Sequence, residues 1–340
     1  MTMRRTVSKG YSVLMLTFAV LSVGVSAQKP ATSAATADAA GLPVRIWKDP
    51  GDMASLNLND GAGGKGHAPD LASVFTFVSD DAAATSPKFD VIDQQGVGWK
   101  VKLGPESQSE TAATRFLWAA GYFTDEDYYL ADLKVAGLPI PLKRGQEFLS
   151  PGGVVHGARM ERKRAADTKL GDWDWFENPF VGTRDLNGLR VMMSLLNSWD
   201  LKQVNNAIYV VSGERQYVVS DVGATFGKTG SAMTRTRGVP RDFEDSKFID
   251  KVTPGFIDFV LHSRPLFLGA IAVPNYRERT KMEEITKHIP RGDVRWLAQR
   301  LSRLTAAQVR DGFRAGGFEA DDVETLAGAL ERRIAALGAL

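Results

Sequence analysis

Hydrophobic and polar residues alternate over short stretches in the first half of the chain, which is the pattern of β-strands. Between the third and fourth stretches, apolar residues recur every three or four positions over 107–120, and Gly121 follows as a helix C-cap. The first half therefore predicts one sheet with one helix. The predicted strands are 74–78, 89–92, 99–103, 128–135 and 154–161.

The second half carries mainly helical patterns, interrupted by a hairpin of two strands at 207–211 and 216–219. A β-rich half followed by a mainly helical half is typical of an α+β fold. We expect two lobes of a kinase-like arrangement, a β-rich N-lobe over 42–165 and a mainly helical C-lobe over 166–340. The predicted helices of the C-lobe are 186–197, 292–304, 305–315 and 319–337.

The N-terminus has the pattern of a secretory signal peptide. Three basic residues in the first nine positions precede an apolar run over 11–25, and small residues offer a cleavage site before Gln28. The run is shorter than the roughly 20 apolar residues that span a membrane. We expect residues 1–27 to be a signal peptide, 28–41 a flexible leader, and the mature chain to be periplasmic or secreted without a membrane span.

Charge and cysteine content exclude several functional classes. The chain has 42 basic and 40 acidic residues, and the signal peptide holds three of the basic ones and none of the acidic ones. The mature chain therefore carries 39 basic against 40 acidic residues, which gives no indication of a nucleic-acid partner. The chain has no cysteine, so it forms no disulfide. Its four histidines lack the spacing of a zinc site, and no Gly-x-Ser-x-Gly motif supports a Ser-His-Asp hydrolase.

A lysine and a glutamate near the third predicted strand form the first candidate site. Lys102 lies at the end of this strand, and Glu110 lies near the start of the following helix. A helix carboxylate can hold a strand lysine through a charge-assisted hydrogen bond, and that lysine can reach nucleotide phosphates. Lys100 projects from the same face of the strand, so the sequence leaves the choice between the two lysines open.

The loop between the first two predicted strands, residues 79–88, is the second candidate. Ser86 and Lys88 could present a hydroxyl group and an ammonium group to phosphates. A plain hairpin loop is the alternative interpretation.

The third candidate is the segment that begins at Trp199, between a predicted helix and a strand. Asp200, then Lys202, then Asn205 have the spacing of the protein-kinase catalytic loop. In that loop the aspartate accepts the proton of the acceptor hydroxyl and the asparagine coordinates magnesium. Asn206 leaves the metal ligand ambiguous by one residue. A helix-ending loop that satisfies backbone groups is the alternative.

The fourth candidate is Asp221, which leaves the predicted hairpin sixteen residues after Asn205 and is followed by Gly223. A strand-exit aspartate of this kind is the magnesium-binding element of kinase-like folds. One carboxylate and one amide oxygen, together with nucleotide phosphates, suit Mg²⁺. An Asx-turn is the alternative for Asp221 alone.

These patches together resemble a known family. Ser-Pro-Lys-Phe at 86–89, Trp-Lys-Val-Lys at 99–102 and the segment 110–121 look like the N-lobe of HipA-type kinases and of the wider group of atypical kinases. That group includes the phosphoinositide kinases and the secreted casein and spore-coat kinases, and the resemblance covers about residues 74–225. The chain differs from the family because it has no Gly-rich loop and no histidine before Asp200.

The resemblance implies a kinase-like phosphotransferase that uses ATP and Mg²⁺ on a protein or small-molecule hydroxyl. It implies one role for each candidate residue. Lys102 would contact phosphates with Glu110 as its partner, Asp200 would act as base beside Lys202, and Asn205 and Asp221 would hold the metal.

Two other functions remain open from the sequence. A pseudokinase-like binding or scaffold module would keep the fold without turnover. An unrelated envelope protein could bind or cleave glycans with the Trp- and Asp-rich segment 171–178, which could instead be an aromatic-anchored loop packed between lobes. A basic stretch that includes Arg235 and Arg237 would engage an anionic substrate in a kinase-like fold, and is otherwise a solvated loop.

Overall fold

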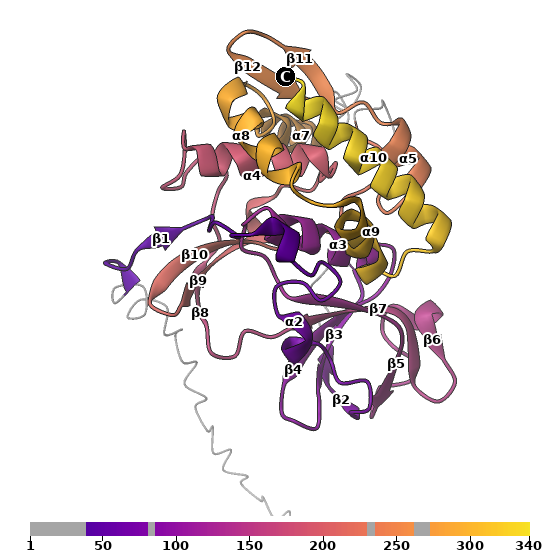
Figure 1. The fold of residues 1–340 in the computed structure, drawn as a ribbon. Coiled ribbons are helices and arrows are strands. Elements are labelled where there is room, and N and C mark those ends of the chain that lie inside the picture. The colour runs from indigo at the N-terminus through magenta and orange to yellow at the C-terminus, as the bar shows by residue number, and fades with distance from the viewer. Residues whose placement is uncertain (1–38, 81–85, 230–234, 262–272) are drawn as a thin grey trace, which may run out of the picture.

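The computed structural model describes residues 39–80, 86–229, 235–261 and 273–340 (Figure 1). The predicted signal peptide, most of the predicted leader and the middle of the loop 79–88 lie outside these residues. Within them, no helix has the length and apolar character needed to cross a membrane.

Five strands of the first half pair in a closed ring. They pair in the order β4–β3–β2–β5–β7, and β7 pairs again with β4. The contact between β2 and β5 is parallel, and the other contacts in the ring are antiparallel. The short strand β6 (Leu149–Ser150) extends the edge beside β7. The ring consists of β2 (Phe75–Asp80), β3 (Lys88–Ile92), β4 (Gly98–Lys102), β5 (Asp127–Ala136) and β7 (Val154–Arg162).

Alternating apolar side chains fill the inside of the ring. Phe89 lies opposite Val101 and Val91 lies opposite Trp99, and all four belong to one buried cluster. The strand predictions followed this alternation and are confirmed to within a few residues. The closure of the ring was not predicted, because it depends on pairing between strands that are distant in the sequence.

Helix α3 (Glu106–Ala119) connects β4 to β5 and lies between the ring and the C-terminal helices (Figure 1). Its Phe116 ring lies 4.9 Å from that of Phe313 and 6.1 Å from that of Phe226. These aromatic contacts anchor the body of α3 to the C-terminal half, while its first turn follows directly from the end of β4.

A second sheet forms in the order β1–β10–β9–β8. The hairpin of β9 and β10 is the predicted one, whereas β1 and β8 join it from distant parts of the chain. Arg215 donates to the carbonyl oxygens of Ala40 and Leu42, so the end of the predicted leader contacts this sheet. The strands are β1 (Val44–Arg45), β8 (Thr168–Gly171), β9 (Asn206–Val211) and β10 (Glu214–Val219).

The remaining elements of the second half are mainly helices, together with a small sheet in the order β11–β12–β13. The second half thus holds more strand than the single predicted hairpin, and the mixed α+β class is confirmed. The strands are β11 (Ile249–Val252), β12 (Phe256–Phe259) and β13 (Ile289–Pro290). The helices are α4 (Arg184–Leu195), α5 (Pro240–Asp245), α7 (Val273–Glu284), α8 (Arg291–Leu301), α9 (Ala306–Ala315) and α10 (Ala320–Gly338). The described residues hold four further short helices, η1 (Met53–Ser55), α2 (Gly64–His67), η2 (Gln146–Phe148) and η3 (Gln203–Asn205).

Candidate functional site

A cleft of about 550 Å³ lies where the end of β4, the first turn of α3 and the segments around Asp200 and Asp221 meet. Lys102 and Glu110 lie behind its wall, and their side chains are fully buried. The eight candidate residues of the sequence thus gather at one place. The six that line the cleft are Ser86, Lys88, Asp200, Lys202, Asn205 and Asp221.

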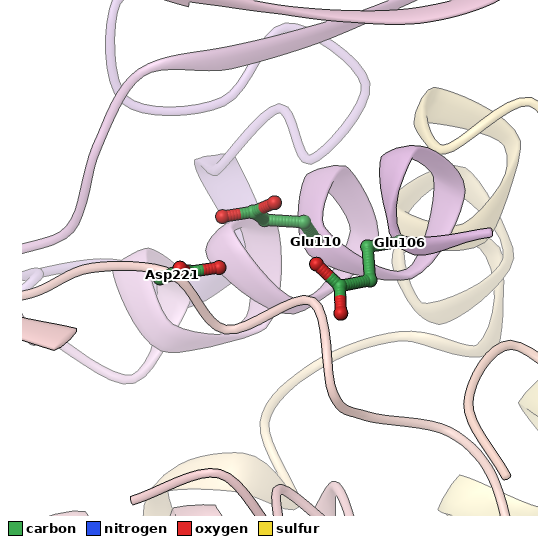
Figure 2. A group of neighbouring side chains, drawn as sticks. All are labelled: Glu106, Glu110 and Asp221. Carbon is green, nitrogen blue, oxygen red and sulfur yellow. The ribbon is translucent and has the colours of Figure 1, made fainter. Parts of the chain in front are cut away.

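The ammonium group of Lys102 lies among three carboxylates. Its Nζ atom is 2.5 Å from Oε2 of Glu106 and 2.8 Å from Oε2 of Glu110. The same atom is 2.6 Å from Oδ1 of Asp221. Figure 2 shows the three carboxylates close together, two from α3 and one from the segment after β10. Burial alone would lower the pKa of Lys102, but Glu110 and Asp221 raise it above its usual value, so the lysine stays charged.

Local geometry explains why these groups meet. Glu106 and Glu110 are one helical turn apart, so they share a face of α3. Gly104 has φ +99°, which glycine tolerates, and this turn takes the chain from β4 directly into the helix. The hydroxyl of Ser107 donates to the carbonyl oxygen of Lys102 and fixes the turn. The end of the strand and the start of the helix are therefore held together beside the cleft.

Asp221 adopts a left-handed backbone conformation with φ 47°, which is uncommon for a residue other than glycine. Its second carboxylate oxygen lies 3.6 Å from Nζ of Lys88, at the start of β3. Burial alone would raise the pKa of Asp221, but Lys102 and Lys88 hold it far below its usual range. Asp221 is therefore ionised at neutral pH. Sparsely populated backbone conformations of this kind cluster at functional sites.

Arg159, which no motif indicated, supports the site from the outer face of the ring, where α3 packs. It lies opposite Lys102 in the pairing of β7 with β4 and is almost fully buried. Its Nη1 atom is 3.1 Å from Oε1 of Glu110 and 3.0 Å from Oδ1 of Asp127. Its Nη2 atom is 3.0 Å from Oε2 of Glu161. Glu110 thus uses one oxygen for Lys102 and the other for Arg159, which fixes its orientation.

Glu106 is the second residue that the sequence reasoning missed. Its Oε2 atom accepts hydrogen bonds from Lys102 and from the hydroxyl of Ser86, the latter at 3.2 Å, and its Oε1 atom accepts one from Arg237. Burial alone would raise the pKa of Glu106, but Lys102 and Arg237 lower it. Its spacing was the available signal, since Glu106 is four residues after Lys102 and four before Glu110.

The segment around Asp200 is held by hydrogen bonds of its own. Oδ1 of Asp200 lies 2.8 Å from Nζ of Lys202. The side-chain amide of Asn205 donates to the backbone carbonyl of Asp200 at 2.7 Å. The backbone N–H of Ser220 donates to the carbonyl oxygen of Asn205 at 2.9 Å, which ties this segment to the residue before Asp221.

The sequence left two choices open, between Asn205 and Asn206 and between Lys102 and Lys100, and the structure distinguishes the members of each pair. Asn205 lines the cleft, whereas Asn206 is buried and donates to a backbone carbonyl elsewhere. Lys102 lies among the three carboxylates, whereas Nζ of Lys100 is 3.5 Å from Glu161 and is part-exposed. Lys102 and Asn205 are therefore the members of each pair that lie at the cleft.

The Trp- and Asp-rich segment 171–178 packs into the protein. Trp173 and Trp175 are buried and their rings lie 4.9 Å apart. Asp174 forms an ion pair with Lys281 at 2.9 Å. Since buried tryptophans cannot stack on a sugar, the arrangement favours the packed loop over a glycan site.

A hydrogen-bonded chain of a serine, a histidine and an aspartate lies away from the cleft. Oγ of Ser150 is 2.5 Å from Nε2 of His156, and Nδ1 of His156 is 2.6 Å from Oδ1 of Asp132. These bonds are exposed on the outer face of the ring. Pro151 follows the serine, so that position has no N–H for an oxyanion. The Ser150–His156–Asp132 arrangement therefore lacks the enclosed pocket of a hydrolase site.

No protein-family model matches the chain, and no curated protein matches it. Among solved structures, it is similar to the one titled "Crystal structure of A Helicobacter pylori proinflammatory kinase CtkA". The TM-score is 0.42 at 11% identity, over 78% of this chain and 96% of that chain. A likeness of this size does not assign a function, so the functional argument depends on the geometry of the cleft.

Replacing Asp221 by asparagine should lower the free energy of unfolding at neutral pH, because it removes a carboxylate that two lysines contact. The pKa of Asp221 is lower in the folded protein than in the unfolded chain. Its stabilising contribution is therefore complete above the ordinary aspartate pKa of about 3.9 and is lost as the pH falls below it. Urea titrations should show that the wild-type advantage over Asp221→Asn is constant from about pH 7 to about pH 5 and shrinks as the pH falls below about 4.

Asp245→Asn is the control for this comparison. Asp245 ends α5 and is exposed, so removing its charge should change stability far less. A wild-type advantage over Asp221→Asn that stays constant across the pH range would contradict the account.

Proposed function

We propose that the protein is an exported, kinase-like phosphotransferase that uses ATP and Mg²⁺ to phosphorylate a hydroxyl group of a protein or small molecule. One observation carries the proposal. The buried ammonium of Lys102 contacts both Glu110 and Asp221, at the back of a cleft lined by Asp200 and Asn205.

We further propose two lobes, an N-lobe over 42–165 and a C-lobe over 166–340. The support is that the strand ring has an apolar core of its own, separate from the larger core shared by α3, α4 and the C-terminal helices. The cleft is lined both by residues before 165, such as Lys88, and by residues after it, such as Asp200. A nucleotide bound there would contact both lobes.

In this proposal each residue of the site has a separate role in phosphoryl transfer. Lys102 binds the nucleotide phosphates, and Glu110, whose carboxylate Arg159 orients, holds its ammonium in place. The acceptor hydroxyl oxygen attacks the terminal phosphorus, and the bond from that phosphorus to the ADP oxygen breaks. Asp200 accepts the hydroxyl proton, and Lys202 orients its carboxylate. Positioning and charge neutralisation supply most of the catalysis in this chemistry.

The donor set of the cleft fits magnesium. Asp221 offers a carboxylate and Asn205 an amide oxygen, which are ligands that Mg²⁺ takes together with phosphate oxygens and water. Asp221 and Asn205 would therefore hold the ion, whose charge would offset that of the phosphates.

Asp200→Asn should keep nucleotide binding and lose turnover, because only the proton acceptor changes. We expect ATP hydrolysis or transfer to fall by roughly 10²–10⁴-fold. Thermal unfolding with Mg-ATP at 100 times its Kd should still show about 2.7 kcal/mol of stabilisation. Asp221→Asn is the matched variant and should lose this stabilisation.

A wild-type protein that Mg-ATP does not stabilise would contradict the proposal. Stabilisation without any turnover by the wild type would instead indicate a pseudokinase-like binding module.

Export is tested separately. If the chain is exported and cleaved before Gln28, the intact mass of the protein recovered outside the cytoplasm should correspond to residues 28–340. Recovery of only the full-length mass, inside the cells, would refute this part of the proposal.

A further inference from the structure

Three donors from three separate parts of the chain converge on the carboxylate of Glu106. They are the ammonium of Lys102 at the end of β4, the hydroxyl of Ser86 before β3, and the guanidinium of Arg237 before α5. Glu106, Ser86 and Arg237 all line the cleft. Two cations and a hydroxyl around one anion are the donors that proteins use for phosphate groups.

Lys102 does not need Glu106 as a partner. Its ammonium also contacts Glu110 at 2.8 Å and Asp221 at 2.6 Å, so it stays paired without Glu106. Glu106 lies in the first turn of α3, where a change of side-chain rotamer would move the carboxylate without moving the helix. The contacts of Glu106 can therefore be exchanged for those of a ligand.

Arg237 is held in place by groups other than Glu106. Its guanidinium lies 5.6 Å from the ring centroid of Trp199, the residue before Asp200. The indole N–H of Trp199 donates to the carbonyl oxygen of Thr236 at 3.0 Å. The backbone N–H of Gly238 donates to the carbonyl oxygen of Thr225 at 2.9 Å. These bonds fix the backbone on both sides of Arg237, so its side chain is positioned for an anion in the cleft.

We propose that Lys102, Ser86 and Arg237 form a phosphate subsite, that Glu106 occupies it when no ligand is bound, and that a ligand phosphate displaces Glu106. Glu106 is thus an internal competitor of the ligand, and Arg237 is a phosphate-binding residue. The assignment of the phosphate to a nucleotide rests on the proposed function. The subsite itself rests on the contacts of Glu106.

Calorimetric titration of the full mature chain with inorganic tripolyphosphate tests the subsite without assuming a nucleotide. Glu106→Gln should bind it about tenfold more tightly than the wild type, which corresponds to about 1.4 kcal/mol. Arg237→Gln should bind it more weakly. The loss caused by Arg237→Gln should be larger in the Glu106→Gln background, where Glu106 no longer competes for the arginine, so a double-mutant cycle should show coupling.

Glu147→Gln is the charge control. Glu147 lines the same cleft, and its replacement removes an equal charge without removing a contact to Lys102, Ser86 or Arg237. It should tighten binding much less than Glu106→Gln does. Melting curves of each variant confirm folding, and glutamine at 106 can still accept hydrogen bonds.

Equal or weaker binding of tripolyphosphate by Glu106→Gln than by the wild type would overturn the subsite, and so would an equal gain in Glu147→Gln. Parallel titrations with Mg-ATP and O-phosphoserine identify the source of the phosphate. A gain for tripolyphosphate and Mg-ATP supports the whole inference. A gain for tripolyphosphate without any Mg-ATP binding keeps the subsite and overturns the proposed function. A gain for phosphoserine but not for Mg-ATP overturns the nucleotide assignment in favour of a phosphorylated acceptor.

Discussion

The buried ammonium of Lys102 is the constraint around which this structure is arranged. An unpaired charge in a protein interior is unstable, so a buried lysine must either lose its proton or find carboxylates. Here Glu106, Glu110 and Asp221 surround it, and their charges keep it protonated. The three carboxylates contact Lys102 only if their backbone segments keep their positions. The ammonium group therefore links the end of β4, the first two turns of α3 and the segment that follows the β9–β10 hairpin.

The coupling extends to the strands of the ring, on the face where α3 packs. Glu110 joins Lys102 to Arg159, and Arg159 also contacts Asp127 and Glu161 on neighbouring strands. Removing one member of such a network leaves a buried charge uncompensated. The charged residues between the ring and α3 therefore fix the orientation of Glu110 and, through it, that of Lys102.

Sequence patterns predicted the local parts of this arrangement well. Alternation identified the ring strands because one face of each is buried, and helical periodicity identified α3 and the C-terminal helices. The candidate residues from 86 to 221 could be identified because the spacings of a catalytic loop and of a hairpin are local features of a single sequence. The structure brings these residues together at one cleft. The ring closure, Arg159 and the role of Glu106 were not predicted. The ring closure and Arg159 depend on contacts between segments far apart in the chain, and a charged residue in an apolar strand gives no sign of its partners. Glu106 had a local signal in its spacing from Lys102, but its contacts with Ser86 and Arg237 join distant segments. The choice of Asn205 over Asn206 likewise needed the backbone of the loop, because only its path decides which side chain reaches the cleft.

The central claim is that Lys102, behind the wall of the cleft, and Lys88, in its lining, contact nucleotide phosphates. An acyl-phosphate derivative of ATP, which transfers its acyl group to an amine held beside the phosphates, tests this most directly when the modified peptides are mapped by mass spectrometry. The account predicts acylation concentrated on Lys102 or Lys88 and suppressed by excess ATP. Acylation spread over exposed surface lysines, unchanged by ATP, would contradict it.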